Sequence, residues 1–323
     1  MPWRCHDLGC EKGQEKREKD LLTTSSVPGA RFVDPVVLSR IGNLELVARH
    51  VVDGFINGMH RSPYFGASVD FAEHRGYVAG DDIRRVDWRL YARTDRFYIK
   101  EYEADTNANF SVLLDVSKSM GFGSRGLSKL EYAKMLAGCL TYLVHKQRDR
   151  VGLIAFDSDI VAHVPPSAKH MDVVLHTLDR LAPSGPGSLR APLHKMAEHF
   201  GRRGLLVLVS DLYEEPDAVL EAIGPLRFRG NDLIVFHLLD QAELDFTFDT
   251  PAAFEDLESG VQIPVVPDKL AEQYRSLVRA HIDGLQERFS ANRIDYSVVN
   301  TSSPLDHALF SYLTTRERLT RVR

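Results

Sequence analysis

The chain has 323 residues, of which 44% are apolar and 26% charged, enough for one large domain or two ordinary ones. Its net charge of −5 and isoelectric point near 6.2 provide no basic surface for nucleic acid. No apolar stretch reaches the roughly 18 residues of a membrane span, and the beginning lacks the apolar centre of a secretory signal. Three cysteines are a poor disulfide framework. We therefore expect a cytoplasmic protein.

The first third of the chain divides into two parts. Residues 1–30 are polar and densely charged, which predicts a disordered tail. Residues 31–108 are more mixed and predict a smaller α+β leading region. Within it, apolar residues recur at three- and four-residue steps from Asp34 to Met59, the pattern of a helix. Residues 97–102 predict a short strand or hairpin.

Residues 109–323 alternate apolar strands with amphipathic helices. The predicted strands are 110–114, 151–157, 205–210, 232–239 and 295–300, with 157–164 as a hairpin arm after the second. The predicted helices are 127–146, 171–181, 191–200, 218–226 and 269–290, and residues 246–267 are a loop or hairpin insertion. This alternation predicts an α/β fold with a doubly wound, mainly parallel sheet.

Oxygen-bearing side chains follow the first of these strands. The apolar run 110–114 ends in Asp115, and Ser117 and Ser119 follow at steps of two. Ligands of open α/β sheets bind at the carboxyl ends of the strands, and clustered hard oxygens suit Mg²⁺. Aspartate and serine are also common in caps and turns after strands, so the spacing alone does not decide.

Two further donors belong to the same edge of the predicted sheet. Asp211 follows strand 205–210, and the loop before the helix at 191–200 carries Ser188, with Ser184 as a substitute. Two close carboxylates repel each other, and a divalent ion reverses that preference. Hard-oxygen sites do not distinguish Mg²⁺ from Mn²⁺ or Ca²⁺. The predicted metal ligands are Asp115, Ser117, Ser119, Ser188 and Asp211.

A glycine-rich segment resembles a dinucleotide fingerprint. Residues 121–126 read Gly-Phe-Gly-Ser-Arg-Gly between a strand and a helix. Six residues separate the strand from the first glycine, which is wrong for that motif, so we interpret the segment as a mobile loop. No Walker A sequence and no G-x-S-x-G elbow is present. We expect a binding protein and not an enzyme. The alternatives are a Rossmann-like dinucleotide-binding enzyme, a metal-assisted hydrolase, or a structural scaffold with a vestigial metal site.

The Asp-x-Ser-x-Ser motif with its later serine and strand-end aspartate resembles the metal-ion-dependent adhesion site of von Willebrand factor A domains. Upstream, Glu-His-Arg-Gly-Tyr at 73–77, Gly-Asp-Asp-Ile-Arg-Arg-Val-Asp-Trp at 80–88 and Ala-Arg at 92–93 resemble the signature of the domain-of-unknown-function 58 family. The resemblance covers roughly residues 35–320 and implies a von Willebrand factor A-like domain over 109–323. Many relatives carry membrane helices near the start, and this chain shows none.

The resemblance also implies a function. Members of the family are often encoded beside MoxR-type AAA+ ATPases and are proposed to act with them. It therefore implies a metal-dependent protein-binding module whose partner is such an ATPase or its client. By position, the five predicted ligands match the family's metal loops, although Gly187-Ser188 stands where relatives usually carry threonine after glycine.

The charged residues around Trp88 support a separate prediction. They predict a partly buried ion-pair network that clamps the leading region to the main sheet, or else a partner surface. Its members are Arg75, Asp81, Asp82, Arg84, Arg85, Asp87 and Arg93.

Overall fold

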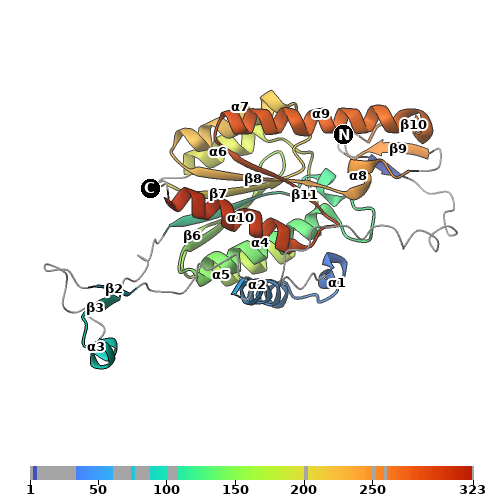
Figure 1. Cartoon of the computed structure of the whole chain (residues 1–323). Coiled ribbons are helices and arrows are strands. Elements are labelled where there is room, and N and C mark those ends of the chain that lie inside the picture. Colours follow the sequence, from blue (N-terminus) through green and yellow to red (C-terminus); the bar gives the residue numbers. More distant parts are fainter. Residues whose placement is uncertain are drawn as a thin grey trace.

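The computed structural model describes residues 3–5, 34–60, 74–76, 88–100, 108–199, 203–248, 252–257 and 260–321. A six-stranded sheet with the strand order β11-β8-β7-β4-β5-β6 forms its centre (Figure 1). The first five strands in this order run parallel, and β6 is antiparallel to β5. The bounds are β4 Asn109–Asp115, β5 Arg150–Phe156, β6 Ile160–Ser167, β7 Gly204–Ser210, β8 Asp232–Leu239 and β11 Asp295–Asn300. The sheet confirms the predicted fold class and the predicted strands.

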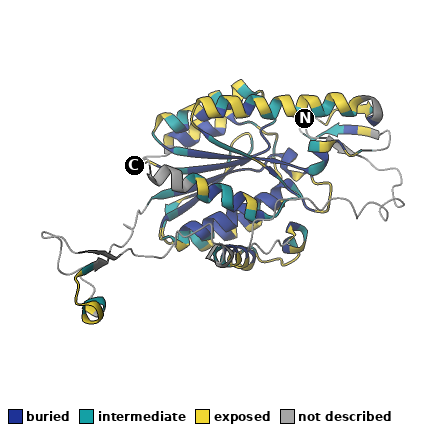
Figure 2. Ribbon diagram, in the orientation of Figure 1, coloured by how far each residue is buried: buried dark blue, intermediate teal, exposed yellow. Residues whose placement is uncertain are grey.

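Helices cover both faces of this sheet (Figure 1). One face carries α4 Lys129–Lys146, α5 Met171–Arg180 and α10 Leu305–Arg321, and the other α6 Arg190–His199, α7 Pro216–Phe228 and α9 Pro267–Ala291. Side chains of β4 alternate between the two cores, with Val112 and Leu114 in one and Leu113 in the other. Because both faces are covered, the central strands are continuously apolar and buried (Figure 2).

The helix α4 begins where the sequence provides a capping box. The Ser128 hydroxyl accepts a hydrogen bond from the Glu131 amide at 3.2 Å, and the Glu131 carboxylate accepts one from the Ser128 amide at 2.8 Å. This reciprocal pair satisfies amides that have no partner within the helix. It makes Lys129 the first residue of the helix, facing the carboxyl edge of the sheet.

The predicted helix from Asp34 to Met59 is two helices, α1 Pro35–Ser39 and α2 Leu44–His60. The break has a local cause. Gly42 adopts a left-handed φ of +63°, and the Asn43 side chain accepts a hydrogen bond from the Leu46 amide at 3.0 Å, which starts a new helix.

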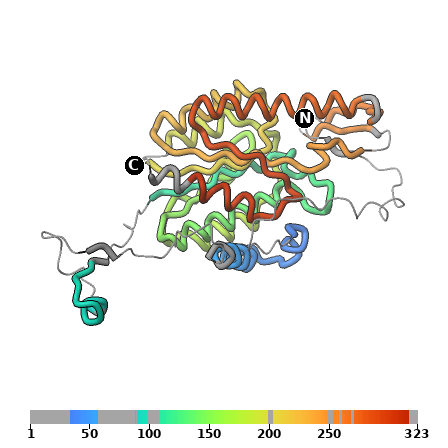
Figure 3. Tube along the Cα trace, in the orientation of Figure 1, coloured from blue at the N-terminus to red at the C-terminus, as the bar shows by residue number. Residues whose placement is uncertain are grey.

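The helix α2 packs against α4 and shares its hydrophobic core (Figure 3). Val52 and Phe55 of α2 are buried in the same cluster as β4. The domain boundary proposed at residue 108 stays a prediction. The buried side chains of residues 34–56 belong to the same hydrophobic core as those of the main sheet.

Three short elements lie further along the leading region. Strands β2 His74–Gly76 and β3 Tyr98–Lys100 pair antiparallel, which confirms part of the strand predicted at 97–102. The helix α3 Trp88–Thr94 lies between them. The Trp88 side chain is 56% exposed and contacts the rings of Tyr91 and Phe97. Trp88 is therefore not buried, as the predicted ion-pair network around it would require. Most of the charged residues predicted for that network lie outside the described residues.

The insertion predicted at 246–267 contains a hairpin of β9 Ala252–Asp256 and β10 Gln262–Val265. Strand β1 Trp3–Cys5 pairs with β9, which corrects the predicted disorder for these three residues because their backbone completes a small sheet. The short helix α8 Gln241–Asp245 and the helix α10 were not predicted. Within the part of the chain that the structure describes, every helix is too short or too polar to cross a bilayer.

Candidate metal site

Asp115 is held in place at the end of β4. It is 5% exposed. Its Oδ1 accepts a hydrogen bond from the Ser117 amide at 2.9 Å, and its Oδ2 accepts one from the Ser210 hydroxyl at 2.6 Å. The parallel register pairs Leu114 with Val209, so the next residues, Asp115 and Ser210, meet across the two strands. Both carboxylate oxygens are thus oriented before any ion binds.

The two serines that follow Asp115 are brought together with it. A 3₁₀ turn, η2 Lys118–Gly121, begins after Ser117. Its geometry places the Ser117 and Ser119 hydroxyl oxygens 2.9 Å apart, and both side chains are buried. The structure therefore gathers the first three predicted ligands at one point of the sheet edge.

Asp211 lies close enough to Asp115 for their charges to interact. Burial, and after it the charge of the neighbouring Asp211, together raise the pKa of the Asp115 carboxyl to about 7, against the opposing hydrogen bonds from Ser210 and Ser117. Two carboxylates in a poorly hydrated site oppose each other's ionisation. A divalent cation would remove that opposition.

The Asp211 side chain also has a partner that the sequence analysis did not anticipate. The Lys129 side chain is 0% exposed, and its Nζ lies 2.8 Å from Oδ2 of Asp211 and 2.8 Å from Oε1 of Glu243. It also donates to the Tyr213 hydroxyl at 3.2 Å. Burial opposes the charge on Lys129, yet Asp211 and Glu243 raise its pKa above the ordinary value. We expected Asp211 to serve an ion, and one of its oxygens is committed to an ammonium instead.

The middle loop reaches the first loop through backbone hydrogen bonds. The Lys118 amide donates to the Gly185 carbonyl at 3.0 Å. The Ser184 hydroxyl donates to Oδ2 of Asp157 at 2.7 Å, and the Ser188 amide donates to the Asp157 carbonyl at 3.4 Å. Among the described residues, Ser188 has no hydrogen bond to the other four predicted ligands. Its assignment as a ligand stays a prediction.

The charge balance at this edge fits a cation. Four carboxylates are buried at the carboxyl ends of β4, β7 and β8, and Lys129 is the only buried lysine or arginine in the described ranges. His237 adds no charge, because burial lowers its pKa to about 3. When all four acids are ionised, three negative charges remain in formal excess. The acids are Asp115, Asp211, Asp240 and Glu243.

The donor chemistry fits a hard ion better than a soft one. In the described parts of the chain, no group of three or more His, Cys, Asp or Glu is arranged to hold a metal. The site would therefore depend on hydroxyl oxygens beside one or two carboxylates, a set that suits Mg²⁺ with retained waters. The residues present fit such an ion. Asp211 differs from the expectation, because one of its oxygens pairs with Lys129.

Three residues of this site carried sequence signals that were missed. A lysine in the first turn of a helix faces the positive end of the helix dipole, which is unfavourable unless acids surround it. Lys129 was therefore a candidate for a buried ion pair. Asp240 and Glu243 have the three-residue spacing of a capping box, which the structure forms at the start of α8.

The glycine-rich segment 121–126 forms a turn beside this site, and of its residues only Phe122 is buried. A Cβ on Gly123 would lie 2.1 Å from the Leu127 carbonyl oxygen, so no side chain fits there. The Ser124 amide donates to Oδ2 of Asp240 at 3.2 Å. These contacts tie Ser124 to the start of α8, while the mobility of the segment stays a prediction. Gly123 has a local steric role that requires no nucleotide.

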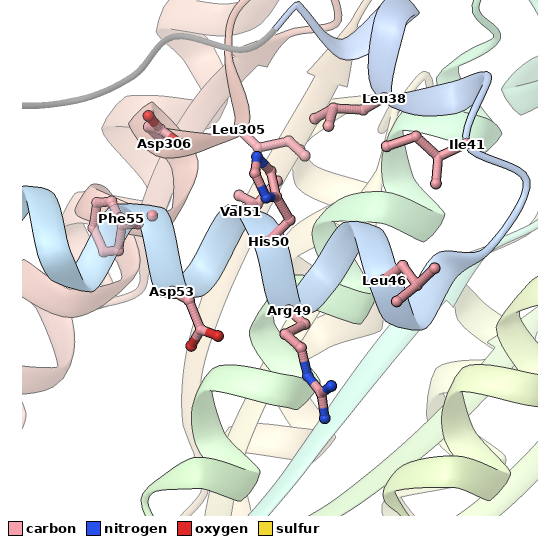
Figure 4. A pocket seen from close by; sticks show the side chains of 11 residues that line it. Leu38, Ile41, Leu46, Arg49, His50, Val51, Asp53, Phe55, Leu305 and Asp306 are labelled. Carbon is pink, nitrogen blue, oxygen red and sulfur yellow. The ribbon is translucent and has the colours of Figure 1, made fainter.

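A separate hollow lies between α2 and the start of α10. Its volume is about 570 Å³, and it is lined by Leu38, Phe55 and Leu305 together with the charged Arg49 and Asp53 (Figure 4). None of the five predicted metal ligands lines it. It is therefore distinct from the candidate metal site.

Comparisons with curated proteins find relatives of this chain in mycobacteria. It is 27% identical over 235 residues to the uncharacterized protein Rv1480 of Mycobacterium tuberculosis, over 71% of this chain and 73% of that protein. The same figures hold for the uncharacterized protein Mb1516 of Mycobacterium bovis.

Two solved structures are similar at low identity. The conserved hypothetical protein BatB from Bacteroides thetaiotaomicron has a TM-score of 0.45 and 17% identity, over 65% of this chain and 99% of that one. An aerotolerance-related membrane protein from Bacteroides fragilis has a TM-score of 0.44 and 19% identity, over 62% and 96%. The family model described as protein of unknown function DUF58 matches residues 73–283, and the chain belongs to that family.

Proposed function

We propose that this chain is a protein-binding module that depends on a divalent metal ion and is not an enzyme. The observation that carries the proposal is the convergence of Asp115, Ser117 and Ser119 at a sheet edge with excess buried negative charge. Mg²⁺ is the ion that best suits this small set of hard oxygens. Mn²⁺ and Ca²⁺ are related candidates.

In this proposal the ion forms a bridge to the partner. Asp115 would hold it, with the hydroxyls of Ser117 and Ser119 beside it and Asp211 and Ser188 as further donors. The ammonium of Lys129 offsets the negative charge of Asp211. Less negative charge would then reach the ion, which would remain electrophilic. An acidic side chain of a partner protein is the chemistry that would complete its coordination.

The partner that we propose is a MoxR-type AAA+ ATPase or a client of one, in the cytoplasm. The support for this identity is the family resemblance of residues 73–93 and the family match over 73–283. The chain contains no Walker A motif, so any nucleotide hydrolysis would belong to the partner.

A capture experiment tests the proposal. The full chain would be immobilised and offered the purified ATPase in Mg²⁺ and again in excess chelator. We expect capture only with Mg²⁺ and none by Asp115→Ala. The matched control is Asp159→Ala, because Asp159 is an exposed carboxylate paired with Lys195 outside the site. Equal capture by the wild type and Asp115→Ala would reject the proposal. Capture by partner variants that lack every surface acid at the contact would reject the bridging role of the ion.

The buried ion pair of Lys129 supports a second candidate, a structural scaffold whose metal site is vestigial. In that case the ammonium is the permanent cation of the site. A Mg²⁺ titration separates the two candidates, because an ion that binds only the folded state raises its stability. The scaffold predicts no rise. Measurable binding of NAD, or turnover of a hydrolysable substrate, would instead favour the enzyme alternatives.

A further inference from the structure

Lys129 is fixed beside the candidate metal site from several directions. Its Nζ is 2.8 Å from an oxygen of Asp211 and 2.8 Å from an oxygen of Glu243. It also lies 4.6 Å from the centre of the Tyr213 ring. These partners come from the segment after β7 and from α8, so the ammonium is held between two elements that are distant in sequence.

The Glu243 side chain is itself held by hydrogen bonds. Lys129 and Glu243 therefore cannot move away from Asp211 as a pair without breaking them. The second oxygen of the Glu243 carboxylate, Oε2, accepts a hydrogen bond from the Asp240 amide at 2.8 Å. The Asp240 carboxylate in turn accepts from the Ala242 amide at 2.8 Å. The capping box of α8 therefore anchors the acid that positions the ammonium.

The ion pair limits how Asp211 can serve a metal. Because Oδ2 carries the charged hydrogen bond from Lys129, Oδ1 is the stronger donor for an ion or for a water bound to it. Mg²⁺ takes six ligands, keeps several waters and is satisfied by single carboxylate oxygens. Ca²⁺ takes six to eight oxygens at longer distances and often uses both oxygens of a carboxylate. A carboxylate restricted to one oxygen therefore disfavours Ca²⁺ more than Mg²⁺.

We propose that Lys129 is a positioning residue that restricts Asp211 to one coordinating oxygen and thereby makes the site selective for Mg²⁺ over Ca²⁺. The inference rests on the proposed function, because it assumes that a divalent ion binds at Asp115. It goes further by assigning the ion preference to a residue that is not a ligand.

The test is a double substitution that keeps the net charge of the site. Lys129→Met together with Glu243→Gln removes one positive and one negative charge, and the glutamine retains an oxygen for the Asp240 amide. Asp211 then has both oxygens available. Dissociation constants for Mg²⁺ and for Ca²⁺ would be measured by calorimetry on the full chain, and binding would also be followed as a shift in thermal unfolding. Lys146→Met is the matched control, because Lys146 lies on the same helix and pairs with the exposed Asp53.

The inference predicts that the preference of the wild type for Mg²⁺ falls by about tenfold in the double variant, the scale on which residues supporting a ligand tune metal affinity. Lys146→Met should keep the wild-type preference. If the wild type and the double variant show the same ratio of Mg²⁺ to Ca²⁺ affinity, the proposed role of Lys129 is wrong, while the proposed metal site is supported. If the wild type binds neither ion, the proposed function itself fails.

A single variant covers the case in which the double variant does not fold. In Glu243→Gln, Lys129 keeps Asp211 as its one carboxylate partner, so the restriction on Asp211 remains. We expect this variant to prefer Mg²⁺ at least as strongly as the wild type does. A loss of that preference in a folded Glu243→Gln protein would overturn the inference.

Discussion

The Ser210 hydroxyl donates a 2.6 Å hydrogen bond to Oδ2 of Asp115 and so connects the carboxyl ends of β7 and β4. Ser210 also accepts a hydrogen bond from the Leu212 amide at 3.1 Å, which turns the chain just beyond Asp211. One buried serine thus orients the central acid of the candidate site and shapes the loop that carries the second acid.

This role predicts the effect of Ser210→Ala. The variant should remain folded, because only one hydroxyl is removed, but Mg²⁺ affinity should fall about tenfold as Asp115 loses the group that orients it. Calorimetric titration measures the change. Ser158→Ala, at an exposed serine outside the site, should bind like the wild type. Unchanged affinity in Ser210→Ala would show that Asp115 needs no support from β7.

Lys129→Met as a single substitution should destabilise the protein strongly without added metal. It leaves Asp211 and Glu243 buried without their counter-ion, a change that costs about 3–5 kcal/mol in buried pairs. Chemical denaturation measures the loss. Lys146→Met should change stability by only about 0–1 kcal/mol, because its pair with Asp53 is exposed. Similar losses for the two variants would contradict the importance of the buried cation.

Gly123→Ala should destabilise the protein by about 1–3 kcal/mol, because an added Cβ would collide with the Leu127 carbonyl and force the backbone to shift. Gly224→Ala provides a control of opposite sign. Gly224 lies inside α7 with no atom within 4 Å of an added Cβ, so alanine should stabilise the helix by about 0.5–1 kcal/mol. Thermal unfolding of both variants checks the two signs. A tolerated Gly123→Ala would show that this turn shifts readily to accept a side chain.

Phe55→Ala should cost about 3–5 kcal/mol, although Phe55 precedes the predicted main domain, because its ring is buried in the core shared with α4. Leu46→Ala on the same helix is the control, since Leu46 is 53% exposed and should cost little. Denaturation of both variants measures the difference. A small loss for Phe55→Ala would mean that α2 is dispensable for the stability of the sheet.

The four central strands β4, β5, β7 and β8 were predictable because each is a largely continuous apolar run, which is what burial on both faces requires. Asp115, Ser117 and Ser119 were predictable for a related reason, because their positions directly follow such a run. The break at Gly42 was missed because the apolar periodicity continues across it, while the φ of one glycine ends the helix. Local backbone chemistry there overrides the pattern.

The ion pair of Lys129 was harder to predict because it is not local. Its acidic partners lie 82 and 114 residues away, and only the order of the strands brings them together. The helix α10 was missed for a similar reason. Its buried side chains, among them Leu309 and Tyr312, join the core around α4 and β4, so its stability depends on tertiary packing.

Thermal unfolding of the full chain during a Mg²⁺ titration tests the central claim most directly. An ion that binds only the folded state stabilises it by about 2.7 kcal/mol at a concentration one hundred times its dissociation constant. We predict a rise in Tm with Mg²⁺ for the wild type and none for Asp115→Ala. A wild-type Tm that does not change with Mg²⁺, Mn²⁺ or Ca²⁺ would contradict the claim that this sheet edge binds a divalent ion.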